Sequence, residues 1–277
     1  MADAEDKMKE LPLSDWPEWR WFDSVEALLK ETVAKVQEYE GNEVGVLYPL
    51  LDSITESVES LRTLVNSLKL RDSYVIARVI YETSVNACFL LTNPETISGR
   101  AHAHAKQKAL RNLTRAIELS GDVIFEFKPQ GAEELLGNPQ HQAWLSEFTS
   151  RSGREITSWT PENVQQRLEA VYLKFGEAKT RGLAFGLLLY RNASEIAHGT
   201  LFGALFSWGA MEIGRPLRGP EDIGKFRRRE LRHLLKLVSF SLESLIRLVN
   251  SVLGDSGAEM AAGRARTDYY QKRGGYA

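Results

Sequence analysis

The chain of 277 residues is 43% hydrophobic and 26% charged, a balance typical of a soluble globular protein with a sizeable core. Its net charge of −2 excludes a global positive field that would attract nucleic acid, so any such binding needs a local basic patch. A single cysteine, Cys88, excludes an intramolecular disulfide and a multi-cysteine zinc site. The acidic N-terminus lacks the apolar core of a signal peptide, and no apolar run approaches the ~20 residues of a membrane span. We therefore expect a cytoplasmic protein.

Residues 1–22 form the first predicted segment, an N-terminal extension. Its first 13 residues are charged and show no periodicity. A dense aromatic cluster follows, made of Trp16, Trp19, Trp21 and Phe22. Because aromatic side chains dominate core burial, we expect this cluster to anchor the extension to the body of the protein. The alternative is that the rings stack on nucleic-acid bases.

Two helices are predicted next, over residues 23–40 and 43–69. Gly41 suits the residue after a helix end, and Asn42 suits the cap of the following helix. In the second helix, apolar residues recur at alternating spacings of three and four: Val44, Leu47, Leu51, Ile54, Val58, Leu61, Val65 and Leu68. This repeat predicts a long helix that packs nearly parallel or antiparallel to a neighbour.

The helix that begins near Asp72 is apolar on most faces but carries Arg78 and Glu82, which share a face because they are four residues apart. After a turn signal at Asn93-Pro94, residues 94–120 predict the most basic helix of the chain. Its basic residues are Arg100, His102, His104, Lys106, Lys108, Arg111 and Arg115. We expect a solvated face there, and contact with RNA phosphates is the alternative.

Residues 121–160 are rich in glycine and proline and predict a long irregular segment, with short helical turns near 132–136 and 140–148. Thr160 and Pro161 predict the start of a further helix. A central helix is then expected over 177–208, followed by a second loop.

The central helix contains a polar island between two apolar runs, from Arg191 to His198. On a helical wheel Arg191, Glu195 and His198 point in nearly the same direction, Ser194 lies at the edge of that arc, and Asn192 lies about a quarter turn away. A helix that is apolar nearly all round is normally buried. The pattern therefore predicts a cation, a carboxylate and an imidazole on one stripe of a buried helix, where charges are costly unless paired.

The last long helix is expected over residues 221–253, with a second heptad pattern: Leu231, Leu234, Val238, Leu242, Leu245, Val249 and Val252. Its first turns are basic and include Arg227, Arg228 and Arg229. Residues 254–277 are expected to be disordered. With no useful strand pattern, the prediction is an all-α fold: a single helical bundle over 23–253, without a sheet, with 43–69 and 221–253 as long antiparallel core helices.

Three features together resemble the bacterial DUF5677 family over most of residues 40–250: Arg78-x3-Glu82 in an apolar helix, a helix led by Trp159, and Tyr190…Ser194-x3-His198-Gly199. The polar island also resembles the signature of HEPN ribonucleases, an arginine and a polar residue followed by a histidine. Here Arg191 and Asn192 precede His198. The HEPN resemblance implies a dimeric, metal-independent endoribonuclease without a cofactor, in which the two motif helices face each other.

The resemblance also implies roles for individual residues. His198 would be the acid–base group, Arg191 the cation that holds the phosphate, and Asn192 the orienting group. Glu82 and Glu195 would set the tautomer and charge of His198, and Arg78 would hold Glu82. Ser194 would be a further supporting residue. Arg227, Arg228 and Arg229, or the basic helix 94–120, would bind the RNA backbone.

The resulting prediction is a toxin or antiviral-defence ribonuclease that acts on RNA as a homodimer, with an antitoxin or regulatory protein as a possible partner. The alternative is a non-enzymatic binding or regulatory protein. In that case Arg78, Glu82, Arg191, Glu195 and His198 would form a buried polar network that fixes helix register. We expect no metal site, since His102 and His104 are two residues apart and diverge on a helix.

Overall fold

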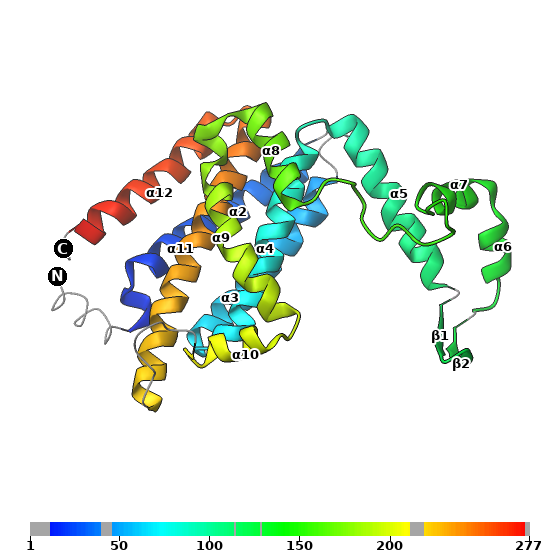
Figure 1. Ribbon diagram of the computed structural model, residues 1–277. Helices are drawn as coiled ribbons and strands as arrows, with labels where there is room; N and C mark the ends of the chain where they lie inside the picture. The colour runs from blue at the N-terminus through cyan, green and yellow to red at the C-terminus, as the bar shows by residue number, and fades with distance from the viewer. Residues whose placement is uncertain (1–11, 40–45, 114, 128, 211–218, 275–277) are drawn as a thin grey trace. The chain divides into compact units, whose positions relative to one another are not determined.

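The computed structural model describes residues 12–39, 46–113, 115–127, 129–210 and 219–274. Within these residues the chain is mostly helical, with eleven α-helices, one 3-10 helix and one two-stranded hairpin (Figure 1). The elements are η1 (Leu13–Asp15), α2 (Pro17–Glu38), α3 (Leu47–Asn66), α4 (Leu70–Leu90), α5 (Pro94–Asn112), β1 (Ala116–Leu119), β2 (Asp122–Glu126), α6 (Ala132–Gly137), α7 (Pro139–Glu147), α8 (Val164–Phe175), α9 (Glu177–Ala197), α10 (Leu201–Ser207), α11 (Pro220–Val252) and α12 (Ser256–Gly274). The predicted all-α class is confirmed, and the hairpin is the exception to the expected absence of a sheet.

The chain divides into two compact units. The helical body comprises Met1–Thr92 and Val164–Ala277, and the inserted unit comprises Asn93–Asn163. The sequence predicted one bundle over 23–253. The structure differs from this prediction in that residues 93–163 make their contacts mainly with one another.

The two heptad patterns form the core of the helical body. All six of the α3 positions from Leu47 to Val65 that the pattern marks are buried, and so are the α11 positions from Leu231 to Val249. Helix α3 packs on α2 and α4, whereas α11 packs on α2, α4, α9 and α12. In Figure 1, α4, α9 and α11 run side by side through the middle of this body. Burial of these apolar faces is what holds the body together.

The aromatic cluster anchors the N-terminal segment, as expected. Trp16, Trp19, Trp21 and Phe22 are all buried. The anchor is part of helix α2, which begins at Pro17 and not at residue 23. The ring of Trp21 also stacks on Tyr269, with 4.7 Å between centroids.

The predicted disorder of residues 254–277 is wrong for the described part, which forms helix α12 on α2 and α11. Its Gly- and Arg-rich composition gave no sign of two side chains that are buried in this helix, Ala262 and Tyr269. The helix start is also fixed locally, because Asp255 accepts a hydrogen bond from the Ala258 amide (3.0 Å) and pairs with Lys35 (2.5 Å).

In the inserted unit, the basic side chains of α5 hold the segment that follows α7. Arg111 donates hydrogen bonds to the carbonyl oxygens of Leu145 and Phe148, and Arg100 donates to that of Trp159 (3.0 Å). Lys108 pairs with Glu155. Much of the expected solvated face is therefore a scaffold for residues 145–159, and these contacts do not favour the alternative of an RNA-binding helix.

Two other sequence boundaries in this region are corrected. Helix α5 ends at Asn112, and the following residues form a hairpin whose two-residue turn, Ser120-Gly121, has positive φ at both positions (55° and 92°). This is the backbone that a tight hairpin turn requires. Helix α8 begins at Val164, three residues beyond the predicted start at Pro161.

Candidate functional site at the corner between α9 and α10

The predicted central helix is two helices joined at a sharp corner. Helix α9 ends at Ala197 and α10 begins at Leu201. At the corner Gly199 has φ +66°, and its amide donates to Ile196 O (3.2 Å) while the Thr200 amide donates to Glu195 O (3.4 Å). These are the two hydrogen bonds of a Schellman motif, with glycine at the left-handed position. His198 is therefore the last residue before the turn.

Thr200 starts the next helix immediately. Its hydroxyl accepts a hydrogen bond from the Gly203 amide (3.2 Å), so it caps the N-terminus of α10. A Cβ atom on Gly203 would lie 2.7 Å from the Cα atom of Ile196. The short helix α10 is thus packed tightly back on the end of α9, which fixes the backbone on both sides of His198.

The buried face of α9 is built on two glycines. A Cβ atom on Gly182 would lie 2.1 Å from the carbonyl oxygen of Phe240 in α11, and one on Gly186 would lie 2.2 Å from the ring of Tyr81 in α4. Leu189 and Ile196 continue the same buried face toward the corner. With its backbone held this close to α4 and α11, α9 presents its opposite face to solvent.

That opposite face carries the polar stripe, defined here as Arg191, Asn192, Glu195 and His198. All four residues are exposed. The expectation of a stripe on a buried helix is therefore wrong. The apolar runs misled the prediction because several of their residues are themselves exposed, such as Leu188 at 61%.

The stripe side chains are free of intramolecular partners. Across the described ranges, none of the four makes a side-chain hydrogen bond or ion pair, even though Arg191 and Glu195 are four residues apart on one helix. Ser194 differs, because its hydroxyl donates to the carbonyl oxygen of Tyr190 (2.8 Å) and is turned toward its own helix. The guanidinium of Arg191 and the imidazole of His198 are thus both available to a ligand.

Arg78 and Glu82 lie together on α4 but away from His198. Their side chains are 3.8 Å apart (Nε to Oε2), and the Arg78 guanidinium lies 5.2 Å from the ring centroid of Tyr190. Neither is bonded to His198. The expected role of Glu82 in setting the His198 tautomer is therefore not supported by this geometry, and Arg78 instead contacts α9 at Tyr190.

A pocket of about 260 Å³ opens beside the corner. It is lined by Arg71, Ile196, Gly199, Thr200, Ala204, Ser207 and Trp208. The start of α4 thus faces the end of α9, with Arg71 opposite Gly199. Glu82 lies eleven residues further along α4, roughly 16 Å from Arg71 along the helix axis, which is why it does not reach His198.

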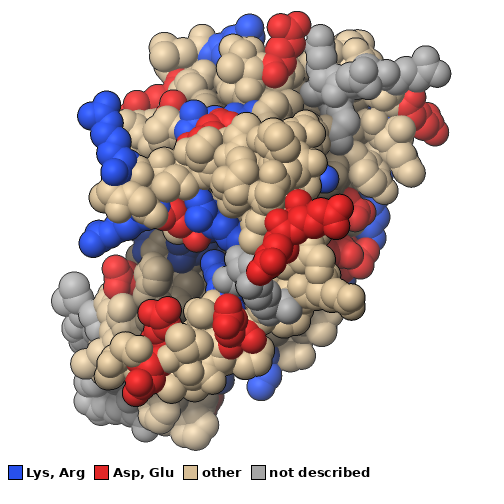
Figure 2. Space-filling view, turned by 90° about the vertical axis from the view of Figure 1, so that its right-hand side faces the viewer, with Lys and Arg blue, Asp and Glu red and all other residues tan. Residues whose placement is uncertain are grey.

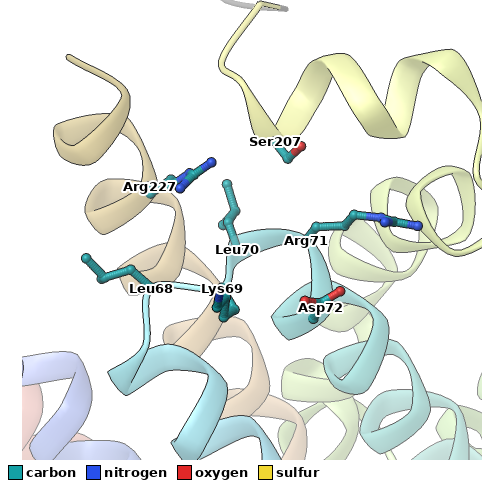
Figure 3. Close-up of a pocket in the computed structure, with 7 residues that line it drawn as sticks. All are labelled: Leu68, Lys69, Leu70, Arg71, Asp72, Ser207 and Arg227. Carbon is teal, nitrogen blue, oxygen red and sulfur yellow. The ribbon is translucent and has the colours of Figure 1, made fainter. Parts of the chain in front are cut away.

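Of the three arginines expected to bind the RNA backbone, Arg227 lines a pocket. That second pocket, of about 160 Å³, also contains Lys69 and Arg71, which the sequence analysis did not single out (Figure 3). Arg229 pairs with Glu230 (3.1 Å), and Arg228 is half-buried. On the face that Figure 2 shows, basic and acidic side chains are mixed among uncharged ones, so any nucleic-acid affinity from this face depends on local groups of cations.

Large apolar side chains flank the polar stripe. Leu188 is followed beyond the corner by Leu201 (75% exposed) and Trp208 (68% exposed). Exposed apolar groups of this size that gather near one site are typical of an interaction surface.

Neither a metal site nor a membrane span emerges from the described part of the chain. It contains no group of three or more His, Cys, Asp or Glu side chains arranged to hold a metal ion. Nor does it contain a helix with the length and apolar character needed to cross a membrane.

The comparison with known proteins gives a family but no activity. No curated protein and no solved structure matches the chain. The model of the family of unknown function DUF5677 matches residues 44–211. This match covers more than half of the chain and includes the inserted unit, the polar stripe and the corner. The chain therefore belongs to the DUF5677 family.

Proposed function

We propose that this protein is a metal-independent endoribonuclease of the HEPN-like type, which cleaves RNA by attack of the neighbouring 2′-OH. The observation that carries the proposal is the exposure of Arg191, Asn192 and His198 on one stripe beside the corner, with no hydrogen bond or ion pair to their side chains from any of the described residues. A site that acts on a polymer must be open to it, and the stripe is open.

The chemistry requires a base for the 2′-OH proton, an acid for the 5′-oxygen and positive charge for the phosphorane. An imidazole serves as acid or base near neutral pH, which is the role of His198. The planar guanidinium of Arg191 holds phosphate oxygens, and Asn192 orients the substrate. Glu195, three residues before His198 on the same stripe, balances the charge of the imidazole.

One subunit does not supply all of these groups to one phosphate. Arg191 and His198 are seven residues apart, about 10.5 Å along the helix axis, and each chain offers one histidine on this stripe. We therefore propose a homodimer with the two stripes facing each other, so that two histidines act as base and acid. Leu188 and Leu201, exposed beside the stripe, suit such an isologous contact.

The dimer is tested by sedimentation at micromolar concentration. Leu188→Arg is expected to shift the protein to the 31 kDa monomer and to abolish RNA cleavage. Met260→Arg is the matched control, because Met260 is equally exposed (59%) but lies on α12, away from the stripe. A wild-type protein that sediments only as a monomer and still cleaves RNA would contradict the two-histidine arrangement.

Cleavage itself is tested with labelled RNA in EDTA. The expected product carries a 2′,3′-cyclic phosphate, and DNA resists because it lacks the 2′-OH. Arg191→Ala and His198→Ala are expected to lose activity. The controls Arg181→Ala, on the same helix, and His102→Ala remove an exposed cation and an exposed imidazole elsewhere. Activity that survives in both stripe variants, or that needs added metal, would remove these residues from the mechanism.

In the cell, we propose a toxin or antiviral-defence role in the cytoplasm, with an antitoxin or regulatory protein that restrains the activity. Expression of the wild-type chain is then expected to arrest growth, and expression of His198→Ala is not.

A second candidate is a non-enzymatic binding or regulatory protein. The exposed Leu188, Leu201 and Trp208 favour it, since such side chains suit a protein partner as well as a second copy. The version in which the stripe is a buried network is not supported, because the stripe is exposed. Failure to cleave any RNA, combined with loss of a partner in Leu188→Arg, would favour this candidate.

A further inference from the structure

The pocket of about 160 Å³ in Figure 3 is built from three segments that are far apart in the sequence. The connection between α3 and α4 contributes Leu68–Asp72, the end of α10 contributes Ser207, and the second turn of α11 contributes Arg227. Its volume is about ten times the 10–15 Å³ that one water molecule needs, so it has room for a small polyatomic group.

The charge of this pocket is positive. Its lining contains three cationic side chains, Lys69, Arg71 and Arg227, and one carboxylate, that of Asp72. Within the described residues, no side-chain hydrogen bond or ion pair engages any of these four. The Nε atom of Arg227 is buried and has no hydrogen-bond partner. A buried donor without an acceptor is costly to a folded protein, and an anionic ligand would supply that acceptor.

The backbone beside this pocket also favours a negatively charged ligand. Leu68 has φ +52°, which is unusual for a leucine, and the Lys69 amide donates to Leu64 O (2.9 Å). This turn ends α3 and starts α4 within three residues. The amides of Arg71 and Asp72, in the first turn of α4, have no backbone acceptor among the described residues. Unpaired amides and the helix dipole both favour an anion at such an end.

We propose that this pocket binds a backbone phosphate of the RNA strand. A phosphate group matches the lining, because it offers several acceptor oxygens to the guanidinium of Arg227 and the ammonium of Lys69. Figure 3 shows Arg227 and Ser207 on either side of Leu70, with Arg71 directed away from Arg227. Phosphate binding as such stands on the pocket alone, whereas the choice of a strand over a free phosphate rests on the proposed function.

Continuity with the corner pocket favours the strand. Arg71 and Ser207 line both pockets. A phosphate held by Lys69 and Arg227 therefore places the next part of a strand in the corner pocket, whose lining includes Gly199, the residue after His198. Trp208 lines that second pocket and is 68% exposed, so its ring is open to stack on a base.

The test measures binding separately from cleavage. The ligand is a 2′-O-methyl RNA oligonucleotide, which has no free 2′-OH to attack, titrated into the full chain at several salt concentrations. Arg71→Gln and Arg227→Gln are each expected to weaken binding by about tenfold at low salt and to lower the salt slope by roughly 0.7. Arg227→Lys keeps the charge but loses Nε, and is expected to fall between wild type and Arg227→Gln.

Arg181→Gln is the matched control, since Arg181 is an exposed arginine of α9 that does not line the pocket, and its affinity is expected to stay within about twofold of wild type. Thermal melting checks that each variant is folded. Equal RNA affinity in wild type, Arg71→Gln and Arg227→Gln would overturn the proposal.

Inorganic phosphate and adenosine monophosphate, titrated alone, identify the source of the anion. If Arg227→Gln abolishes their binding but leaves RNA binding intact, the pocket is a site for free phosphate and the strand assignment is overturned. RNA binding that depends on Arg71 and Arg227 in a protein without cleavage activity supports this inference while rejecting the proposed nuclease. Cleavage that depends on His198 but not on Arg71 or Arg227 supports the proposed nuclease and rejects this inference.

Discussion

Substitution of Gly182 by alanine tests how tightly α9 is held against α11. The added Cβ atom would lie 2.1 Å from the carbonyl oxygen of Phe240 and 2.5 Å from the hydroxyl of Ser244. The serine can rotate, but the carbonyl belongs to the backbone of a buried helix, so the two helices must separate. Such overpacking costs about 1–3 kcal/mol. Because the clash involves backbone, we expect the upper end of that range.

The helix propensity of alanine offsets about 1 kcal/mol of this cost, which leaves a net loss of about 2 kcal/mol. For a unit of this size, each kcal/mol shifts the Tm by about 2–4 °C. Gly182→Ala is therefore expected to lower the Tm by about 4–8 °C, measured by circular dichroism at 222 nm.

Gly224→Ala is the matched control in α11. Nothing lies within 4 Å of the Cβ position of Gly224, so only the propensity gain remains and the Tm is expected to rise by about 2–4 °C. If Gly182→Ala melted at or above the wild-type temperature, the close approach of α9 to α11 would be refuted.

Three further predictions concern buried carboxylates. Burial alone would raise the pKa of Glu26, but its hydrogen bonds, first of all the one from Arg62, outweigh burial and lower the pKa below the ordinary value of 4.5. The ionised Glu26 therefore stabilises the fold, and this stabilisation is lost as the pH falls through the lowered pKa. Burial raises the pKa of Glu243, so the protein loses stability as the pH rises above 4.5. Both effects are measured as the free energy of unfolding in urea at several pH values. Glu26→Gln is expected to lower this free energy most at neutral pH, and Glu243→Gln is expected to raise it most there. Arg232→Ala strips the buried Glu18 of the cation 3.0 Å away and is expected to cost about 3 kcal/mol in the same assay.

The parts of the fold that could be predicted from sequence are those where one residue pattern decides the outcome. The 3-4 repeats of α3 and α11 fix a buried face whatever surrounds it. The large aromatic side chains of the cluster at Trp16–Phe22 likewise favour burial in the core. For both, local pattern and tertiary environment agree.

The errors lie where an apolar pattern does not coincide with burial. The hairpin Ala116–Glu126 is apolar, yet all of its residues are exposed, so no alternation of buried and exposed faces marks its strands. The only sequence signal was Ser120-Gly121, a turn pair that standard hairpin chemistry allows. Residues 177–208 were likewise predicted to form one buried helix, although His198-Gly199-Thr200 carries a helix stop and a new cap.

The candidate site could be predicted only in part, for a geometric reason. Arg191, Asn192 and His198 belong to one helix and its end, so their proximity follows from helical spacing. Lys69, Arg71 and Arg227 come together only because α3, α4, α10 and α11 meet at one end of the helical body. The spacing of residues within one segment does not predict contacts between segments that are far apart in the sequence.

The two faces of α9 lead to the last prediction, which separates stability from activity. Arg191→Ala and His198→Ala remove exposed side chains that have no partner among the described residues, and such changes are usually within ±0.5 kcal/mol. We expect both variants to melt within about 2 °C of wild type while RNA cleavage is lost. Ile196→Ala, on the buried face of the same turn, is expected to cost about 2–5 kcal/mol. A drop of several degrees in His198→Ala would show that the imidazole supports the fold, and the catalytic interpretation of the stripe would then lose its main argument.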